Sequence, residues 1–217
     1  MRSRPQRQNP RAVTLRFGGN ADVRALTAFY TKNQHPYVAF RVHRLAPLLE
    51  QQSFILAESG SAVVAAGGFE CHEMDGSRPY VELIQGRVLR SGAGLYRLLI
   101  AWRVLAIDVR YKGEATIFCE VDEVNTRARS VYEHLGFQRF APGDELYIAA
   151  IESLPNDKRP AALGYSFVWY YLPSPVKVRL LATLRAAVGG NDYSAFIDLS
   201  TLVSPSAALR HLTSLQQ

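Results

Sequence analysis

The sequence is poor in cysteine and in long apolar runs, and each scarcity excludes a class of protein. Its two cysteines, Cys71 and Cys119, form no CxxC pair and no cysteine–histidine cluster among the 217 residues, so we expect neither a disulfide framework nor a metal site. No window approaches the roughly 18 unbroken apolar residues of a membrane span, and residues 1–11 are too polar for a secretory signal. We therefore predict a cytoplasmic protein that has no membrane partner.

Positive charge is concentrated at the start of the chain. The formal net charge is +6, and four arginines lie in residues 1–11, which contain no acidic residue. A basic tail can bind nucleic acid, but the rest of the chain is nearly balanced in charge. We interpret residues 1–11 as a disordered basic tail and predict no nucleic-acid partner.

Apolar residues make up 48% of the sequence, enough for one sizeable core, and their spacing predicts both strands and helices. Strands are expected at 12–17, 54–58, 62–71, 80–88, 115–121, 145–151 and 165–172. Helices are expected at 20–31, with Asn20 as N-cap, and at 45–52, 95–110, 125–135, 176–188 and 207–215. The three strands between 54 and 88 should be antiparallel, whereas 80–88, 95–110 and 115–121 should form a βαβ unit with parallel strands.

A glycine loop, LRSGAG, joins the strand at 80–88 to the helix at 95–110. Glycines let the backbone approach a ligand closely, and the unpaired N–H groups at a helix start bind anions, so a pyrophosphate fits there. Gly94 is not followed by the Lys-Ser/Thr of a P-loop, and Arg97 stands where a dinucleotide-binding fingerprint needs its third glycine. A turn with a purely structural role is the open alternative.

This loop resembles the coenzyme loop of the GNAT superfamily of acetyl-coenzyme A dependent N-acyltransferases. The family's loop reads Gln/Arg-x-x-Gly-x-Gly/Ala at the start of a long helix, and Gly92 and Gly94 match both glycine positions. Leu89 departs from the family's Gln or Arg, a contact that the neighbouring Arg90 could supply.

A second motif of the same family lies on and after the predicted helix 125–135. The family pattern is Asn-x-x-Ala followed by an aromatic residue and then Gly-Phe. Its members in this chain are Asn125, Ala128, Tyr132, Gly136 and Phe137. The two motifs together are more specific than either alone.

The resemblance implies a fold and a cosubstrate. The fold class is α/β (α+β): a mixed, mostly antiparallel twisted sheet with a central βαβ unit and flanking helices, in one acyltransferase domain at 12–173. Residues 174–217 are then a C-terminal helical extension of unknown role. Acetyl-CoA, or another acyl-CoA, is the implied cosubstrate, without a metal. The implied cofactor-binding residues are Val88, Leu89, Arg90, Ser91, Gly92, Ala93, Gly94, Leu95, Asn125 and Ala128.

Acyl transfer from a thioester to an amine needs an acid for the departing thiolate. A phenol can protonate a thiolate at modest cost, because the reference pKa values are about 10 and about 8.5. In the family a tyrosine at this place on the helix is the usual general acid, and the resemblance carries that role to Tyr132. The open alternative is that Tyr132 only completes an apolar stripe.

The reaction also needs a base for the amine and a stabilised oxyanion. Glu82 is our choice of base, with Glu120 and Asp122 as alternatives, and a structural carboxylate is the competing interpretation of each. The family separates this strand from its parallel neighbour, and the interruption at Gln85-Gly86 predicts a bulge that frees a backbone N–H for the oxyanion.

The loop at 32–44 is expected to border the acceptor. Tyr37 and Phe40 are the candidate substrate-binding residues in it. His35, His43 and His72 are further candidate bases, although a lone histidine is more often an ordinary polar residue.

The leading functional hypothesis is transfer of an acetyl group from acetyl-CoA to a primary amine, by direct attack in a ternary complex. The acceptor is a small molecule or a peptide, and a homodimer is left open. Two alternatives are kept: transfer of a longer acyl chain, as N-acyl amino acid synthases do, and a non-catalytic coenzyme-binding or interaction module.

Overall fold

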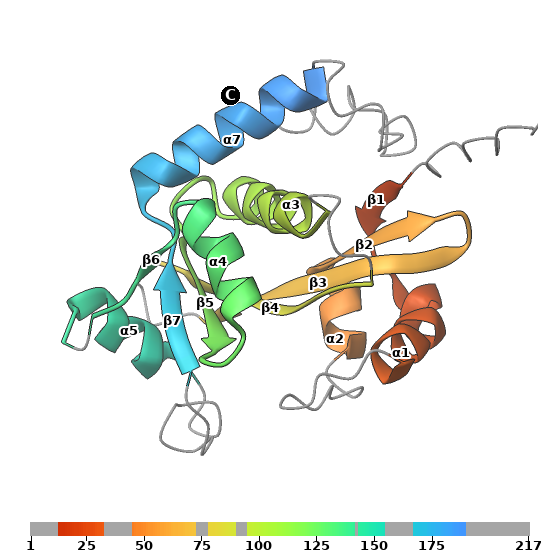
Figure 1. The fold of residues 1–217 in the computed structure, drawn as a ribbon, viewed down its shortest axis with the longest axis horizontal. Coiled ribbons are helices and arrows are strands. Elements are labelled where there is room, and N and C mark those ends of the chain that lie inside the picture. The colour runs from red at the N-terminus through yellow and green to blue at the C-terminus, as the bar shows by residue number, and fades with distance from the viewer. Residues whose placement is uncertain are drawn as a thin grey trace, which may run out of the picture.

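A mixed sheet organises the residues that the computed structural model describes, namely 13–32, 45–72, 78–89, 95–141, 143–154 and 167–189. Within them the strand order is β1-β2-β3-β4-β5-β7-β6 (Figure 1). The strands are β1 (Thr14–Phe17), β2 (Phe54–Ser59), β3 (Ala62–His72), β4 (Tyr80–Val88), β5 (Thr116–Asp122), β6 (Gln138–Arg139) and β7 (Phe167–Tyr171). The helices are η1 (Asn20–Asp22), α1 (Val23–Lys32), α2 (Leu45–Glu50), α3 (Leu95–Arg110), α4 (Thr126–His134), α5 (Glu145–Ser153) and α7 (Ser174–Gly189). The predicted tail at 1–11 and the predicted helix at 207–215 lie outside the described residues, as do residues 33–44 of the predicted acceptor loop at 32–44 and residues 90–94 of the predicted glycine loop at 89–94.

The predicted strand connections are confirmed. Strands β2, β3 and β4 are antiparallel neighbours, and β4 and β5 are parallel and joined by α3. Both β4 and α3 have the predicted bounds. The sheet is mixed and mostly antiparallel, as the family resemblance implied.

Strand β4 parts from β5 and bulges, and these two features shape the centre of the sheet. The two strands pair only from Tyr80 to Glu82, although both continue beyond that point. Further along, Gln85 and Gly86 together lie opposite the single residue Gly67 of β3, and Gln85 has a positive φ of 54°. Two residues against one is a β-bulge, so the predicted bulge at Gln85-Gly86 is confirmed.

Helices cover the two faces of the sheet in two groups (Figure 1). Residues of α3, α4 and α7 pack in one apolar cluster with β4, β5 and β7, on what we call the α3 face. Helices α1 and α2 pack against β2 and β3, and α5 packs near β5 and β7, on what we call the α1 face.

Helix α7 confirms the predicted helix at 176–188 and adds to the core of the predicted catalytic domain. Its Leu181 and Leu184 are buried in the cluster of the α3 face. Lys177 donates to the carbonyl of Gly113 at 2.6 Å and lies 3.3 Å from the Asp108 carboxylate. The domain boundary at 173 stays a prediction, and α7, which lies beyond it, packs against the sheet. No helix within the described ranges is long and apolar enough to span a bilayer.

The strand predicted at 145–151 is wrong, because this segment forms α5. Ala150 and Leu154 are buried, and Tyr147 and Ile151 pack against the same cluster. This spacing is that of one helix face, but the apolar run up to Ile151 also fits a buried strand. The closing strand beside β7 is instead β6, whose two residues are exposed and carry no apolar signal.

The prediction of Asn20 as N-cap is also wrong. Residues Asn20–Asp22 form the short helix η1, and the cap is Gly19. The Asp22 carboxylate accepts a hydrogen bond from the Gly19 N–H at 2.8 Å, while the Asp22 N–H donates to the Gly19 carbonyl. Asp22 therefore supplies the reciprocal bond of a capping box, from its side chain back to the N–H of the cap residue, and no side chain caps the first turn as we expected of Asn20.

Candidate active site

Helix α4 carries Tyr132 and is capped at both ends as predicted. The Asn125 side chain accepts a hydrogen bond from the Ala128 N–H at 3.1 Å, which makes Asn125 the N-cap. Gly136 follows the helix with a φ of 86°, the left-handed conformation that glycine adopts without strain. The predicted contacts of Asn125 and Ala128 with a cofactor stay predictions.

Tyr132 lies buried on the α3 face, with its hydroxyl beside that of Tyr96. The two hydroxyl oxygens are 3.4 Å apart, and the rings meet edge to face. Burial raises the pKa of Tyr132 well above its ordinary value, with Tyr96 and Cys119 adding to the rise and the positive charge of Arg103 opposing it. Tyr132 is therefore protonated at neutral pH, as a proton donor must be.

Glu82 and His72 form a buried pair on the opposite, α1 face. Oε2 of Glu82 lies 3.0 Å from Nε2 of His72, and the two side chains are 6% and 4% exposed. Glu70 of β3 is the direct cross-strand neighbour of Glu82. One ligand atom from each of Glu70, His72 and Glu82 lies within 4.8 Å of the others, so this cluster offers a donor set that could hold a metal ion.

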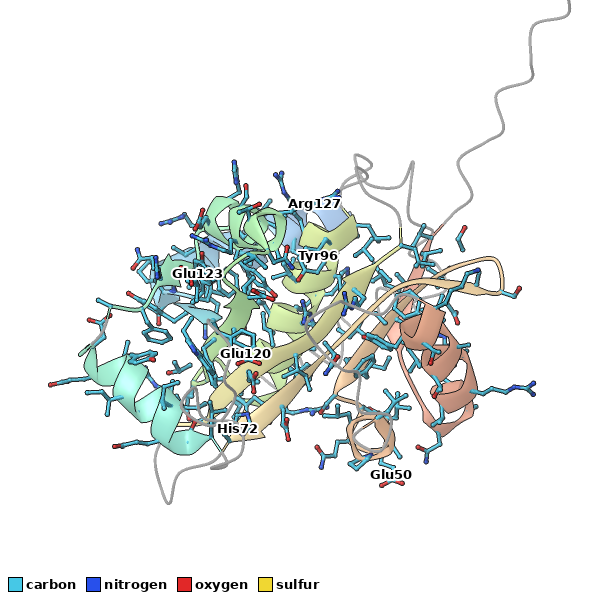
Figure 2. All side chains as sticks on the ribbon, turned by 60° about the horizontal axis from the view of Figure 1, so that its bottom comes forward. Glu50, His72, Tyr96, Glu120, Glu123 and Arg127 are labelled. Atoms are coloured by element: carbon cyan, nitrogen blue, oxygen red, sulfur yellow. The ribbon has the colours of Figure 1, made fainter. Side chains whose placement is uncertain are left out.

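The other two carboxylates predicted as candidate bases, Glu120 and Asp122, lie on β5. Glu120 is two residues beyond Phe118, the register partner of Glu82, and so points to the same face. Figure 2 labels the side chains of Glu120, His72 and Tyr96. Asp122 accepts a hydrogen bond from the Val124 N–H at 3.1 Å. Asp122 thus stabilises the turn after β5, whereas Glu82 has a histidine partner.

The predicted glycine loop is described only at its flanks. Val88 ends β4, and Leu95 begins α3 and is buried. The side chain of Leu89 is 44% exposed, and its N–H donates to the Val64 carbonyl of β3 at 2.8 Å. The N–H of Leu89 is therefore already used by the sheet. Arg90, Ser91, Gly92, Ala93 and Gly94 lie outside the described residues, as do Tyr37 and Phe40.

Tyr96 of α3 lies between Tyr132 of α4 and Gly86 of β4. Its hydroxyl meets that of Tyr132, whose ring stacks at 6.3 Å on Tyr170 of β7. The same hydroxyl would lie 3.1 Å from a Cβ at Gly86 of β4. The structure thus places phenol groups on the α3 side of the opening between β4 and β5 and the Glu82–His72 pair on the other face.

Sequence reasoning missed two residues of this site, Tyr96 and Arg103, both on α3, which was predicted as an apolar helix. His72 was predicted as a further candidate base, but its pairing with Glu82 was not. A charge at position 103 among apolar residues was the available signal for Arg103. Tyr96 pairs with Tyr132, and His72 pairs with Glu82, across separate elements of the fold. No local sequence pattern predicts such contacts.

Comparison with known proteins gives structural neighbours only. No family model matches the sequence, and no curated protein matches it. Naa50 of Arabidopsis thaliana, solved with the bisubstrate analogue CoA-Ac-MVNAL, has a TM-score of 0.56 and 16% identity, over 75% of this chain and 99% of its own. YncA of Salmonella typhimurium, solved with acetyl-CoA as its cofactor, has a TM-score of 0.54 and 18% identity, over 75% and 94%.

A third neighbour carries the family name. A protein of Desulfovibrio desulfuricans assigned to the GNAT family of acetyltransferases has a TM-score of 0.53 and 19% identity, over 75% of this chain and 99% of its own. These likenesses agree with a mixed, mostly antiparallel sheet with flanking helices. By its fold, the chain is similar to the GNAT acetyltransferases.

Proposed function

We propose that the protein is an N-acyltransferase that transfers an acetyl group from acetyl-CoA to a primary amine. The observation that carries the proposal is the opening between β4 and β5, which has a protonated phenol on one face and a buried carboxylate–imidazole pair on the other. This arrangement supplies a proton donor and a proton acceptor at a common place. The fold shared with acetyltransferases supports the same reaction.

Each proton has a route in this scheme. Glu82, held by His72, takes the proton from the attacking amine, whose lone pair forms a C–N bond to the thioester carbonyl carbon. When the C–S bond breaks, the thiolate takes the proton of the Tyr132 hydroxyl. The unpaired edge of β4 beyond Glu82 faces the opening and offers backbone N–H groups to the carbonyl oxygen.

The described part of the site would receive the thioester end of acetyl-CoA. The strands separate where a thioester must pass, and glycine stands at position 86, where a side chain would meet Tyr96. Loop residues Arg90 to Gly94 and the start of α3 at Leu95 would hold the pyrophosphate. A small-molecule or peptide amine would enter from the α1 face, and the peptide-bearing analogue bound by Naa50 favours testing peptides first.

Thiol release from acetyl-CoA in the presence of an amine panel tests the proposal. The panel should contain peptides with a free N-terminus, lysine peptides, polyamines, aminoglycosides and amino acids. We expect release that depends on one amine class, with the acetylated amine identified by mass spectrometry. Binding of acetyl-CoA without release on the whole panel would favour a non-catalytic module, and release from long-chain donors alone would favour a longer acyl group.

A further inference from the structure

Arg103 is a fully buried arginine in the middle of α3, and one of its nitrogens has no partner. Its exposed fraction is 0%. Nη1 donates to the carbonyls of Gly68 at 3.3 Å and Ile84 at 3.2 Å, and Nε donates to the carbonyl of Leu99 at 3.4 Å. Nη2 has no hydrogen-bond partner in the described structure. Burying a charge without a counter-charge is costly, so a role is expected for it.

At two glycines, the backbone of the sheet closely approaches the Arg103 guanidinium. A Cβ at Gly67 would lie 3.2 Å from Cζ of Arg103, and a Cβ at Gly86 would lie 3.1 Å from Nη2. Gly67 and Gly86 are the residues that face each other across the bulge of β4. The positive charge of Arg103 therefore lies immediately behind the bulge, on the α3 face.

A second residue holds the bulge from the other direction without bringing charge. The Tyr30 hydroxyl, on α1, donates to the Gln85 carbonyl at 2.5 Å. Gln85 has a φ of 54°, a conformation that costs free energy in a non-glycine residue. Arg103 and Tyr30 thus fix the same backbone from opposite faces, and of the two only Arg103 is charged. Arg87 of β4, the residue after Gly86, is a second positive charge near Tyr30 and Tyr96.

The bulge belongs to the segment of β4 that no longer pairs with β5. In the proposed reaction, this unpaired edge meets the thioester carbonyl. A fixed positive charge in a water-excluded site stabilises negative charge that develops nearby, and it needs no rearrangement during the reaction. Arginine suits this task because it stays protonated at all working pH values.

We propose, on the basis of the proposed acyl transfer, that the buried Arg103 guanidinium stabilises the oxyanion that forms at the β4 bulge. The amine lone pair forms the C–N bond while the carbonyl π pair moves to oxygen, which becomes the oxyanion. Collapse returns that pair to the C=O bond as the C–S bond breaks, and Tyr132 protonates the sulfur. Arg103 keeps its protons throughout and acts across the backbone of the bulge, so it is a positioning residue.

The test is the carbonyl stretch of carbonyl-13C acetyl-CoA bound to the full-length protein without an acceptor, recorded by difference infrared spectroscopy. In wild type we expect the stretch to fall below that of free acetyl-CoA, because the charge behind the bulge polarises the carbonyl. In Arg103→Met the shift should be mostly lost while the Kd for acetyl-CoA changes less than threefold, and turnover should fall by about a hundredfold. Tyr30→Phe is the matched control: it removes an uncharged contact with the same bulge and should keep the shift.

Each outcome decides one claim. An unchanged stretch in Arg103→Met, or an equal loss in Tyr30→Phe, would overturn the role of the charge and leave the acyltransferase proposal standing. If Arg103→Met does not fold, Arg103→Lys keeps the cation: a full or partial shift supports the inference, and a stretch like that of free acetyl-CoA overturns it. Failure of wild type to bind acetyl-CoA would instead contradict the proposed function itself.

Discussion

The two faces of the sheet carry different chemistry at the point where β4 and β5 separate. The α3 face presents phenols, Tyr132 and Tyr96, with a buried arginine behind them. The α1 face presents carboxylates and an imidazole, with Glu82 and His72 in direct contact. The sheet thus separates the proposed proton donor from the proposed proton acceptor, and the proposed reaction needs a substrate that reaches both where β4 and β5 no longer pair.

Glu82→Gln should have the largest effect. The amide keeps the shape of the carboxylate but cannot accept the amine proton, so we expect turnover to fall by about a hundredfold or more, with little change in acetyl-CoA affinity. The measurement is thiol release at saturating acceptor, with calorimetry for binding.

Glu70→Gln is the matched control for this change. Glu70 lies opposite Glu82 on β3 and should tolerate the substitution with less than a threefold loss. If both variants lose activity equally and added zinc restores it, the cluster is a metal site and the proton role of Glu82 is contradicted.

Tyr132→Phe should lower turnover at least tenfold, because the thiolate then leaves without its proton donor. The ring packing against Phe137 and Tyr170 is kept, so we expect the fold and coenzyme binding to persist. Tyr96→Phe, which removes only the neighbouring hydroxyl, should cost less. Equal turnover in Tyr132→Phe and wild type would remove Tyr132 as the acid.

His72→Gln should have a smaller effect, about fivefold on turnover, because glutamine can still donate a hydrogen bond to Glu82. His72→Leu leaves the buried carboxylate unpartnered and should be worse, in both turnover and stability. An effect on KM alone, with kcat unchanged in both variants, would mean that His72 shapes the acceptor pocket and does not position Glu82.

The smallest expected effect is a loss of folding stability at high pH. It should be about equal for the buried tyrosines on the two faces of the sheet. Burial raises the pKa of Tyr132 on the α3 face and of Tyr30 on the α1 face. The unfolded chain ionises these phenols near pH 10, so the folded state holds more protons and its stability falls as the pH rises above 10. Each tyrosine should cost about 0.8 kcal/mol between pH 8 and pH 10.5. Urea unfolding at the two pH values measures this loss, and a smaller pH dependence is expected in Tyr132→Phe.

Local signals predicted most of the fold, and their limits explain the errors. Strand β4, helix α3 and the caps of α4 were predicted because each is specified by a short stretch of sequence. Helix α5 was missed because its apolar run fits either a helix or a buried strand until Leu154 is included. The two residues of β6 belong to the sheet only through their pairing with β7.

The candidate site was predictable in its single residues but not in its pairs. Tyr132 and Glu82 were identified from a motif and from reaction chemistry. Their partners Tyr96 and His72 come from other elements, and contacts of that kind depend on tertiary packing. Arg103 broke the apolar pattern of α3, but the two glycines that accommodate it lie on β3 and β4.

A crystal structure of the protein with bound acetyl-CoA would show whether donor and acceptor meet one thioester. We expect the thioester to lie between β4 and β5 where they separate, with its sulfur within hydrogen-bonding reach of the Tyr132 hydroxyl and its carbonyl at the edge of β4 beside Gly86. A thioester bound away from this opening, or a sulfur separated from Tyr132 by other side chains, would contradict the division of proton donor and acceptor between the two faces.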